Sequence, residues 1–444
     1  MKDSLWSTLK DRLAGWLPAG TGASGSREER ALALLAYDGC PVCGAAEESE
    51  ARWIRYFIAQ GNAEPEVHEA LMASLGPCGR HLRRLVSTRG GGDVFAQTAV
   101  WLARAAGRRA ASDEALAPCP TCARESWAED HAQDTLASTS ARPAVAERLA
   151  ARKGLCFPHL LSALSRRTAR APALRLAELG LQALGATGDE LVARLRGRDE
   201  DAPARAELLR GAALPDVRAR GPLREWAAAV LALDACPCCV GEREAVRGAL
   251  GWIASGPELE PFELRLCPVH LGVLHATDAG AARKVAAGLA AEWSGALGRW
   301  VSAMYGARTP GGRPADRGAA RSNLLGNRAC RACDVGREAG GRVAALVEAA
   351  LRDRGLSETY ARSHGLCLRH LLALPASARQ GVAGETLGAR LSLLGWELEE
   401  AQRKRSWFAR WEAAGPEAGA WKRLPGLLGG SDAGLPAAGL PSPR

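Results

Sequence analysis

One pattern of cysteine and histidine recurs four times in this 444-residue chain: C-x-x-C, then about thirty residues, then C-x-x-H followed by leucine. Each copy supplies three thiolates and one imidazole, a complete ligand set for a tetrahedral ion such as Zn²⁺. Of the 13 cysteines, only Cys238 falls outside the pattern. The predicted ligands, copy by copy, are Cys40, Cys43, Cys78 and His81; Cys119, Cys122, Cys156 and His159; Cys236, Cys239, Cys267 and His270; and Cys330, Cys333, Cys367 and His370.

The local sequence around these ligands favours turns that lead into helices. Proline follows the first cysteine in three copies, as Pro41, Pro120 and Pro237. Proline suits the first position of a helix, and a helix N-terminus stabilises a neighbouring thiolate. In C-x-x-H, positions i and i+3 share one helix face, so both side chains can reach one ion. We therefore expect the two half-sites of each copy to close on a common metal.

Zinc is the metal that this donor set favours, because structural zinc sites are closed tetrahedra of sulfur and nitrogen ligands. Iron–sulfur clusters are the alternative, although four cysteines are their commoner ligand set. A c-type haem is excluded, since histidine never follows the C-x-x-C directly. We expect Cys238 to be a buried small apolar residue; a weaker interpretation makes it a redox-sensing thiol beside Cys239.

The composition predicts an all-α fold. Alanine, leucine, arginine and glutamate dominate, and only 5% of the residues are aromatic. The third spacer is shorter than the others by about two helical turns, a change that preserves the direction in which a helix faces. We predict four helical modules, each stapled by one Cys3His metal site. Copies one and three share the segment that precedes their first cysteine, which suggests two pseudo-repeated halves.

Composition changes along the chain predict the domain boundaries. Gly-, Pro- and charge-rich stretches separate the helical patterns and indicate linkers. The predicted order is an amphipathic helix at 1–18, a flexible linker at 19–29, metal modules at 30–110 and 111–200, a linker at 201–223, a third module at 224–305, a linker at 306–320, a fourth module at 321–412 and a disordered tail at 413–444.

Charge and motif content favour a non-catalytic protein. The net charge of +9 is spread among alternating acidic and basic residues, as in Glu242-Arg243-Glu244, which is typical of solvated helix faces. The basic clusters lack the interleaved aromatic residues of nucleic-acid binding. No phosphate loop or nucleophile elbow is found, and protein ligands fill every predicted metal position. With no signal peptide or apolar run of membrane length, we expect a cytoplasmic protein.

Two segments are predicted to contact partners. Leu5, Trp6 and Trp16 lie on the apolar stripe of the N-terminal helix, which could dock on the chain's own core, on another protein or on a membrane surface. Near the C-terminus, Trp407, Trp411 and Trp421 border the predicted tail and are candidates for a contact surface. The tryptophans inside the modules, among them Trp252 and Trp396, are expected in the core.

The phrases Cys-Pro-x-Cys and Gly-Leu-Cys-x-x-His-Leu (Gly154–Leu160 and Gly365–Leu371) resemble a loose bacterial family of helical proteins with repeated C-P-x-C…C-x-x-H-L motifs, a domain of unknown function. The resemblance spans about residues 30–412 in motif more than in sequence. It implies metal-ligand roles for the sixteen residues and supplies no activity. The sequence thus predicts a zinc-binding scaffold or adaptor, with an iron–sulfur electron carrier as the alternative.

Overall fold

The computed structural model describes residues 26–60, 63–110, 116–152, 154–165, 170–197, 202–210, 214, 223–255, 265–306 and 330–429. Within these ranges all regular structure is helical and no strand is found, so the all-α prediction is confirmed. The amphipathic helix expected at 1–18 lies outside the described residues, as does most of the linker at 19–29 and nearly all of that at 306–320.

The chain divides into two compact units, and each unit draws on both halves of the sequence. Unit 1 comprises Met1–Arg52, Arg124–Ala206 and Ala249–Ala332; unit 2 comprises Trp53–Ala123, Glu207–Gly248 and Cys333–Arg444. The units cut across the module ranges predicted from sequence. Their limits fall inside five helices, which are α3 (Pro41–Ala59), α7 (Pro120–Thr139), α12 (Ala202–Arg210), α14 (Pro237–Ser255) and α18 (Arg331–Ala350). Of these, α12 lies within the predicted linker at 201–223.

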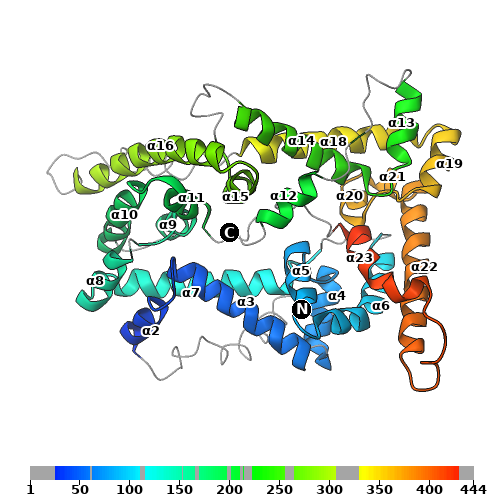
Figure 1. The fold of residues 1–444 in the computed structure, drawn as a ribbon, viewed down its shortest axis with the longest axis horizontal. Helices are drawn as coiled ribbons and strands as arrows, with labels where there is room; N and C mark the ends of the chain where they lie inside the picture. The colour runs from blue at the N-terminus through cyan, green and yellow to red at the C-terminus, as the bar shows by residue number, and fades with distance from the viewer. Residues whose placement is uncertain are drawn as a thin grey trace. The chain divides into compact units, whose positions relative to one another are not determined.

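Unit 1 is built around the long helix α16 (Ala279–Gly306), as Figure 1 shows. Against it pack α10 (Arg170–Leu184), α11 (Gly188–Arg196) and α15 (Pro268–Thr277), and α9 (Phe157–Ser165) packs on α10 and α11. Gly180 permits the close crossing of α10 with its neighbours, since a Cβ there would lie 2.2 Å from Leu160 and 3.3 Å from Leu297. At the edge of the unit, α2 (Arg27–Leu34) packs against α8 (Pro143–Ala151).

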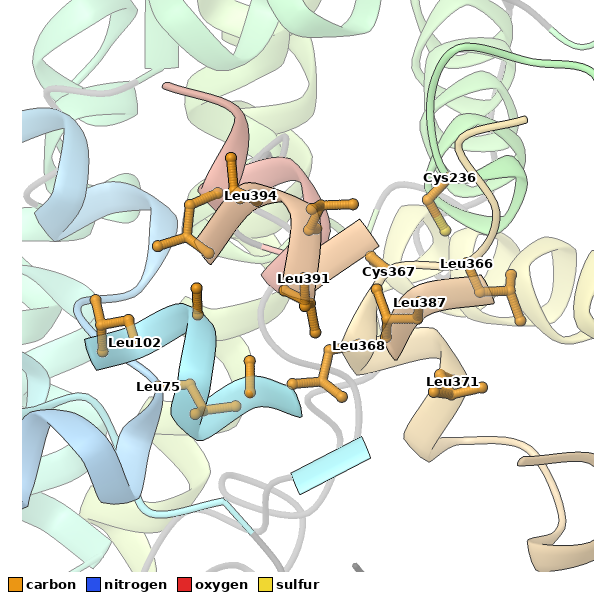
Figure 2. Packing of buried hydrophobic residues seen from close by; sticks show 14 of the residues in the cluster. Leu75, Leu102, Cys236, Leu366, Cys367, Leu368, Leu371, Leu387, Leu391 and Leu394 are labelled. Carbon is orange, nitrogen blue, oxygen red and sulfur yellow. The ribbon is translucent and has the colours of Figure 1, made fainter. Parts of the chain in front are cut away.

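Unit 2 has its core between α6 (Gly91–Ala110) and α22 (Val382–Lys404), which lie side by side in Figure 1. The buried residues of α22 recur every three or four positions, so they form one apolar face. Leu391 and Leu394 of α22 belong to the same buried cluster as Leu102 of α6, and Figure 2 shows these side chains. This unit also contains α4 (Pro65–Ser74), α5 (Gly79–Ser87), α13 (Leu223–Leu231), α19 (Arg354–Arg362), α20 (Leu368–Leu372) and α21 (Ala376–Arg379).

Part of the segment predicted as a disordered tail, residues 416–428, is instead helical. A 3-10 helix, η3 (Pro416–Gly419), leads into α23 (Ala420–Leu428), and α23 packs against α6 and α22. Its buried residues Leu424 and Leu427 share one face, and Trp421 meets the Phe95 ring edge-on at 6.2 Å. The Gly- and Pro-rich composition concealed this short amphipathic pattern. Residues 430–444 lie outside the described part of the chain.

Two tryptophans expected in the core lie at the surface. Trp252 is 48% exposed and Trp396 is 63% exposed, because each stands on the outer side of its helix. Among the described residues, no helix combines the length and the apolar character that a membrane-crossing segment needs.

Candidate metal centres

The structure brings all sixteen predicted ligands together in four groups of three cysteines and one histidine. The groups do not follow the copies of the motif. Instead, copy one pairs with copy two, and copy three with copy four. Within each pair, the C-x-x-H of the first copy joins the C-x-x-C of the second, and the C-x-x-C of the first copy joins the C-x-x-H of the second. Site A is Cys40, Cys43, Cys156 and His159; site B is Cys78, His81, Cys119 and Cys122; site C is Cys236, Cys239, Cys367 and His370; and site D is Cys267, His270, Cys330 and Cys333.

This nested pairing corrects the prediction that each copy closes on itself. The reason lies in the helices between the half-sites of one copy. After Cys43, the 19-residue helix α3 carries the chain away by about 28 Å at 1.5 Å per residue. The next helix, α4, has 10 residues and recovers only about 15 Å. Cys78 and His81 therefore meet the next C-x-x-C of the chain rather than their own.

All eight half-sites have the same local structure, because each sits at the beginning of a helix. The first cysteine directly precedes the helix, and the second ligand is its third residue. Cys78, Cys267 and Cys367 are N-caps with extended backbone. Two helix N-termini thus converge on every site, and their positive ends favour thiolate over thiol. The helix pairs are α3 with α9 at site A, α5 with α7 at B, α14 with α20 at C, and α15 with α18 at D.

The ligand atoms of each site lie within 4.8 Å of one another. Sγ–Sγ distances are 3.7 Å for Cys43 and Cys156, and 3.8 Å for Cys239 and Cys367. In every site the histidine presents Nδ1 to the sulfurs, for example at 3.1 Å from Cys156 in site A. Three sulfurs and one nitrogen around a common centre are a donor set that could hold a metal ion.

A buried carboxylate supports the histidine of site C. Nε2 of His370 lies 3.2 Å from Oε1 of Glu242, which also accepts a hydrogen bond from Arg369 at 3.1 Å. Glu242 is only 6% exposed, so its assignment to a solvated charged face was wrong. At site A, Glu129 lies 3.4 Å from Nε2 of His159. A carboxylate behind a ligating histidine fixes the ring and raises its basicity.

The protein itself favours the charged forms of several ligands. Burial raises the pKa of the Cys40 and Cys236 thiols, but hydrogen bonds from neighbouring cysteines and histidines outweigh it and leave both pKa values well below the ordinary range. Burial lowers the pKa of His370, yet its contacts with Cys236, Cys239 and Glu242 raise that pKa to about 12. The pKa values of Cys156, Cys239 and Cys367 are raised instead, chiefly by contacts with the neighbouring cysteines, because charge on one sulfur opposes charge on the next. A bound cation would relieve this opposition.

Two glycines that were not identified from the sequence lie against ligand sulfurs of sites A and C. Gly197 follows α11 with a φ of +66°, and a Cβ there would lie 3.3 Å from Sγ of Cys156. Gly429 follows α23 with a φ of +91°, and a Cβ there would lie 3.3 Å from Sγ of Cys367. These glycines could have been found in the sequence, because each directly follows a short amphipathic helix. Sites A and C therefore share a helix C-terminus packed on a ligand sulfur.

Cys238 belongs to none of the four groups. It is fully buried, as expected, and its pKa is raised by a hydrogen bond with Cys236 and by burial.

No family model, curated protein or solved structure matches the chain. The fold and donor sets by themselves define the class: an all-α protein with four Cys3His groups that could bind metal.

Proposed function

We propose that this chain is a non-catalytic scaffold or adaptor protein whose helices are held together by four structural zinc ions. The observation that carries the proposal is the closed donor set. Each site supplies four protein ligands, so a tetrahedral ion bound there has no open position for a substrate or a reactive water. Such sites contribute folding free energy rather than chemistry.

The ligand spacing supports single ions over clusters. Zinc–sulfur bonds of about 2.3 Å in a tetrahedron place two sulfurs about 3.8 Å apart. The Sγ–Sγ distances of 3.6 Å at site B and 3.8 Å at site C match this spacing. A four-iron cluster holds each thiolate on a different iron, and its ligands would have to lie farther apart. Iron–sulfur electron transfer is therefore the less favoured reading of the same residues.

The nested pairing supports a structural role. Site A joins residues as far apart in sequence as Cys40 and His159, and site C joins Cys236 to His370. Metal bonds that close long loops restrict the unfolded chain most. We infer that metal binding and folding are coupled, as in other small helical metal sites.

The adaptor role rests on an exposed aromatic segment after α22. Trp407, Phe408 and Trp411 are 64%, 91% and 73% exposed, and Arg410 lies over both tryptophan rings. Rigid aromatic and arginine side chains are the residues that dominate protein interfaces. We propose that this segment contacts a partner protein. A photo-crosslinker at position 408 should capture one defined partner, which the double variant Trp407→Ala/Trp411→Ala no longer binds.

Metal content tests the zinc assignment. We expect about four zinc ions per chain and no visible absorbance in protein purified without oxygen. Iron with acid-labile sulfide and absorbance in the visible range would replace the structural role by electron transfer. Zinc in all four sites would support the structural role. The next question would then be which partner binds the exposed surface.

Removal of the metal tests its role in folding. A strong chelator should abolish most of the helical circular dichroism signal, since binding free energy is folding free energy at such sites. Re-addition of zinc should restore that signal. A chelated protein that keeps its full helical content and its cooperative melting would contradict the structural role.

A further inference from the structure

Site A opens onto a cavity. About 400 Å³ of space lies between the C-x-x-C turn before α3 and the last turns of α11. Three of the four ligands line it, namely Cys40, Cys43 and Cys156. The rest of the lining consists of four glycines, Ala193 and six charged residues, which are Asp38, Glu47, Arg152, Glu190, Arg194 and Arg196. The sulfurs therefore border a polar cavity.

Site C has the same nested pairing but is closed. Its four ligands are all buried, whereas Cys40, Cys43 and His159 of site A are partly exposed. At positions that match in the repeat, site C has Val240 and Tyr360 where site A has Gly44 and Leu149. Val240 and Tyr360 are both fully buried, and the Tyr360 hydroxyl accepts a hydrogen bond at 2.8 Å from the N–H of Leu366, the residue before Cys367.

From this contrast we propose that Cys40 and Cys43 are an oxidative modification site, at which a small peroxide enters the cavity and converts the pair to a disulfide. The proposal rests on the metal-bound state proposed above. Zinc-bound thiolates remain nucleophiles, and their oxidation is selective for accessible sulfurs. The burial of Cys238 excludes the alternative thiol that the sequence suggested.

The reaction is a two-electron oxidation of the two thiolates. One sulfur attacks a peroxide oxygen, the O–O bond breaks and hydroxide leaves, which gives a sulfenic acid. The second thiolate attacks that sulfur, the S–S bond forms and a second hydroxide leaves. Hydrogen peroxide is thereby reduced to two hydroxide ions. The metal ion loses two of its four ligands and is released from site A.

The experiment uses the full metal-loaded chain and hydrogen peroxide. Metal content is measured first, and released zinc is then followed with a chromogenic chelator while mass spectrometry assigns the disulfides. We expect the ion of site A to leave in a first phase together with a Cys40–Cys43 disulfide, about tenfold faster than Cys236–Cys239 oxidises at site C. Cys119 and Cys122 of site B are also partly exposed, so their oxidation is followed in the same digest as the competing reaction.

A variant that leaves every ligand in place tests the cavity itself. Ala193 lies on the cavity rim in α11 and is exposed, so Ala193→Trp should slow the first phase severalfold without changing the metal content. Any other cysteine pair that oxidises ahead of Cys40–Cys43 in a four-zinc chain overturns this inference alone. An unchanged first phase in Ala193→Trp also overturns it. A chain purified without metal overturns both this inference and the proposed function.

Discussion

Glu242 links His370, a candidate metal ligand of site C, to Arg369. Its carboxylate contacts Nε2 of His370, where both groups are buried, and the guanidinium of Arg369, which is partly exposed. Nδ1 of His370 faces the sulfurs, so a metal ion bound there would leave the ring proton on Nε2, where Glu242 would accept it. This contact orients the ring towards the three sulfurs.

We predict that Glu242→Gln weakens zinc binding at site C by about 10- to 100-fold, as loss of carboxylate support does at other metal-ligating histidines. Chelator competition, with the emptied site identified by cysteine alkylation, measures the change. Glu129→Gln is the matched variant at site A, where the contact is longer and the carboxylate is 36% exposed, so its effect should be smaller. Equal affinities in wild type and Glu242→Gln would contradict the supporting role.

Gly429 is required by both its backbone conformation and its neighbours. Its φ of +91° is in a region that L side chains rarely adopt, and a Cβ would lie 2.8 Å from Cβ of Arg369. We predict that Gly429→Ala destabilises the protein by about 1–2 kcal/mol and loosens site C. Gly388 is the control, since no atom lies within 4 Å of a Cβ built there; Gly388→Ala should stabilise α22 by about 0.5–1 kcal/mol. Thermal melts of the two variants that shift in the same direction would refute the prediction.

At the scale of elements, a carboxylate holds η3 and α23 against α22. Glu417 accepts hydrogen bonds from the Gly415 N–H at 2.7 Å and from Lys404 at 2.9 Å. These two contacts, the backbone one first, lower the pKa of Glu417 to about 2. An unfolded glutamate titrates near 4.3, so the contribution of Glu417 to stability is complete above about pH 4.3 and is lost as the pH falls through about 2.

We therefore predict that Glu417→Gln increases hydrogen exchange of the α23 amides at neutral pH. The excess over wild type should stay constant from about pH 5 to 8 and disappear as the pH falls from about 4 to 2. Wild type and Glu417→Gln should lose metal to the same extent in acid. The difference between their exchange rates therefore reports on the Glu417 carboxylate alone. An excess that persists at pH 2, or that is absent at pH 7, would show that the contacts of Glu417 do not stabilise α23.

The elements also show what could and could not be predicted from sequence. The ligand residues and their helical setting follow from short-range pattern, because Cys-x-x-Cys and Cys-x-x-His place both ligands in one helical turn. The pairing of half-sites depends on the lengths of α3 and α4, and no local signal encodes that difference. Glu242 was misassigned for the same kind of reason, since its burial comes from contacts with Arg369 and His370, more than a hundred residues away.

At the scale of the whole molecule, the helices that follow the C-x-x-H motifs pair across the sequence halves. In unit 2, α6 of the first half packs on α22 of the second, and in unit 1, α10 packs on α16. The four metal sites, in contrast, each join ligands from one half only. Metal bound at these sites would therefore organise each half, whereas apolar packing joins the halves within each unit.

This division of roles predicts the behaviour of separated halves. Fragments 1–200 and 201–444 each keep two complete ligand sets, so each should still bind about two zinc ions. Each lacks the helices that cover its apolar faces, however, and Leu102 in one fragment and Leu391 in the other would become exposed. We expect each fragment alone to melt without cooperativity and to bind a hydrophobic dye.

Mixing the two zinc-loaded fragments should restore a one-to-one complex with cooperative melting, and dye binding should fall. Leu391→Ala in the second fragment should weaken this complex by about 2–5 kcal/mol, since it removes a buried side chain from α22, the helix that packs on α6. Leu393→Ala is its control, because Leu393 lies on the outer face of α22 and is 58% exposed. Fragments that melt cooperatively as monomers, without their complement, would show that each half has a complete core of its own and that packing across the halves is not what holds the units together.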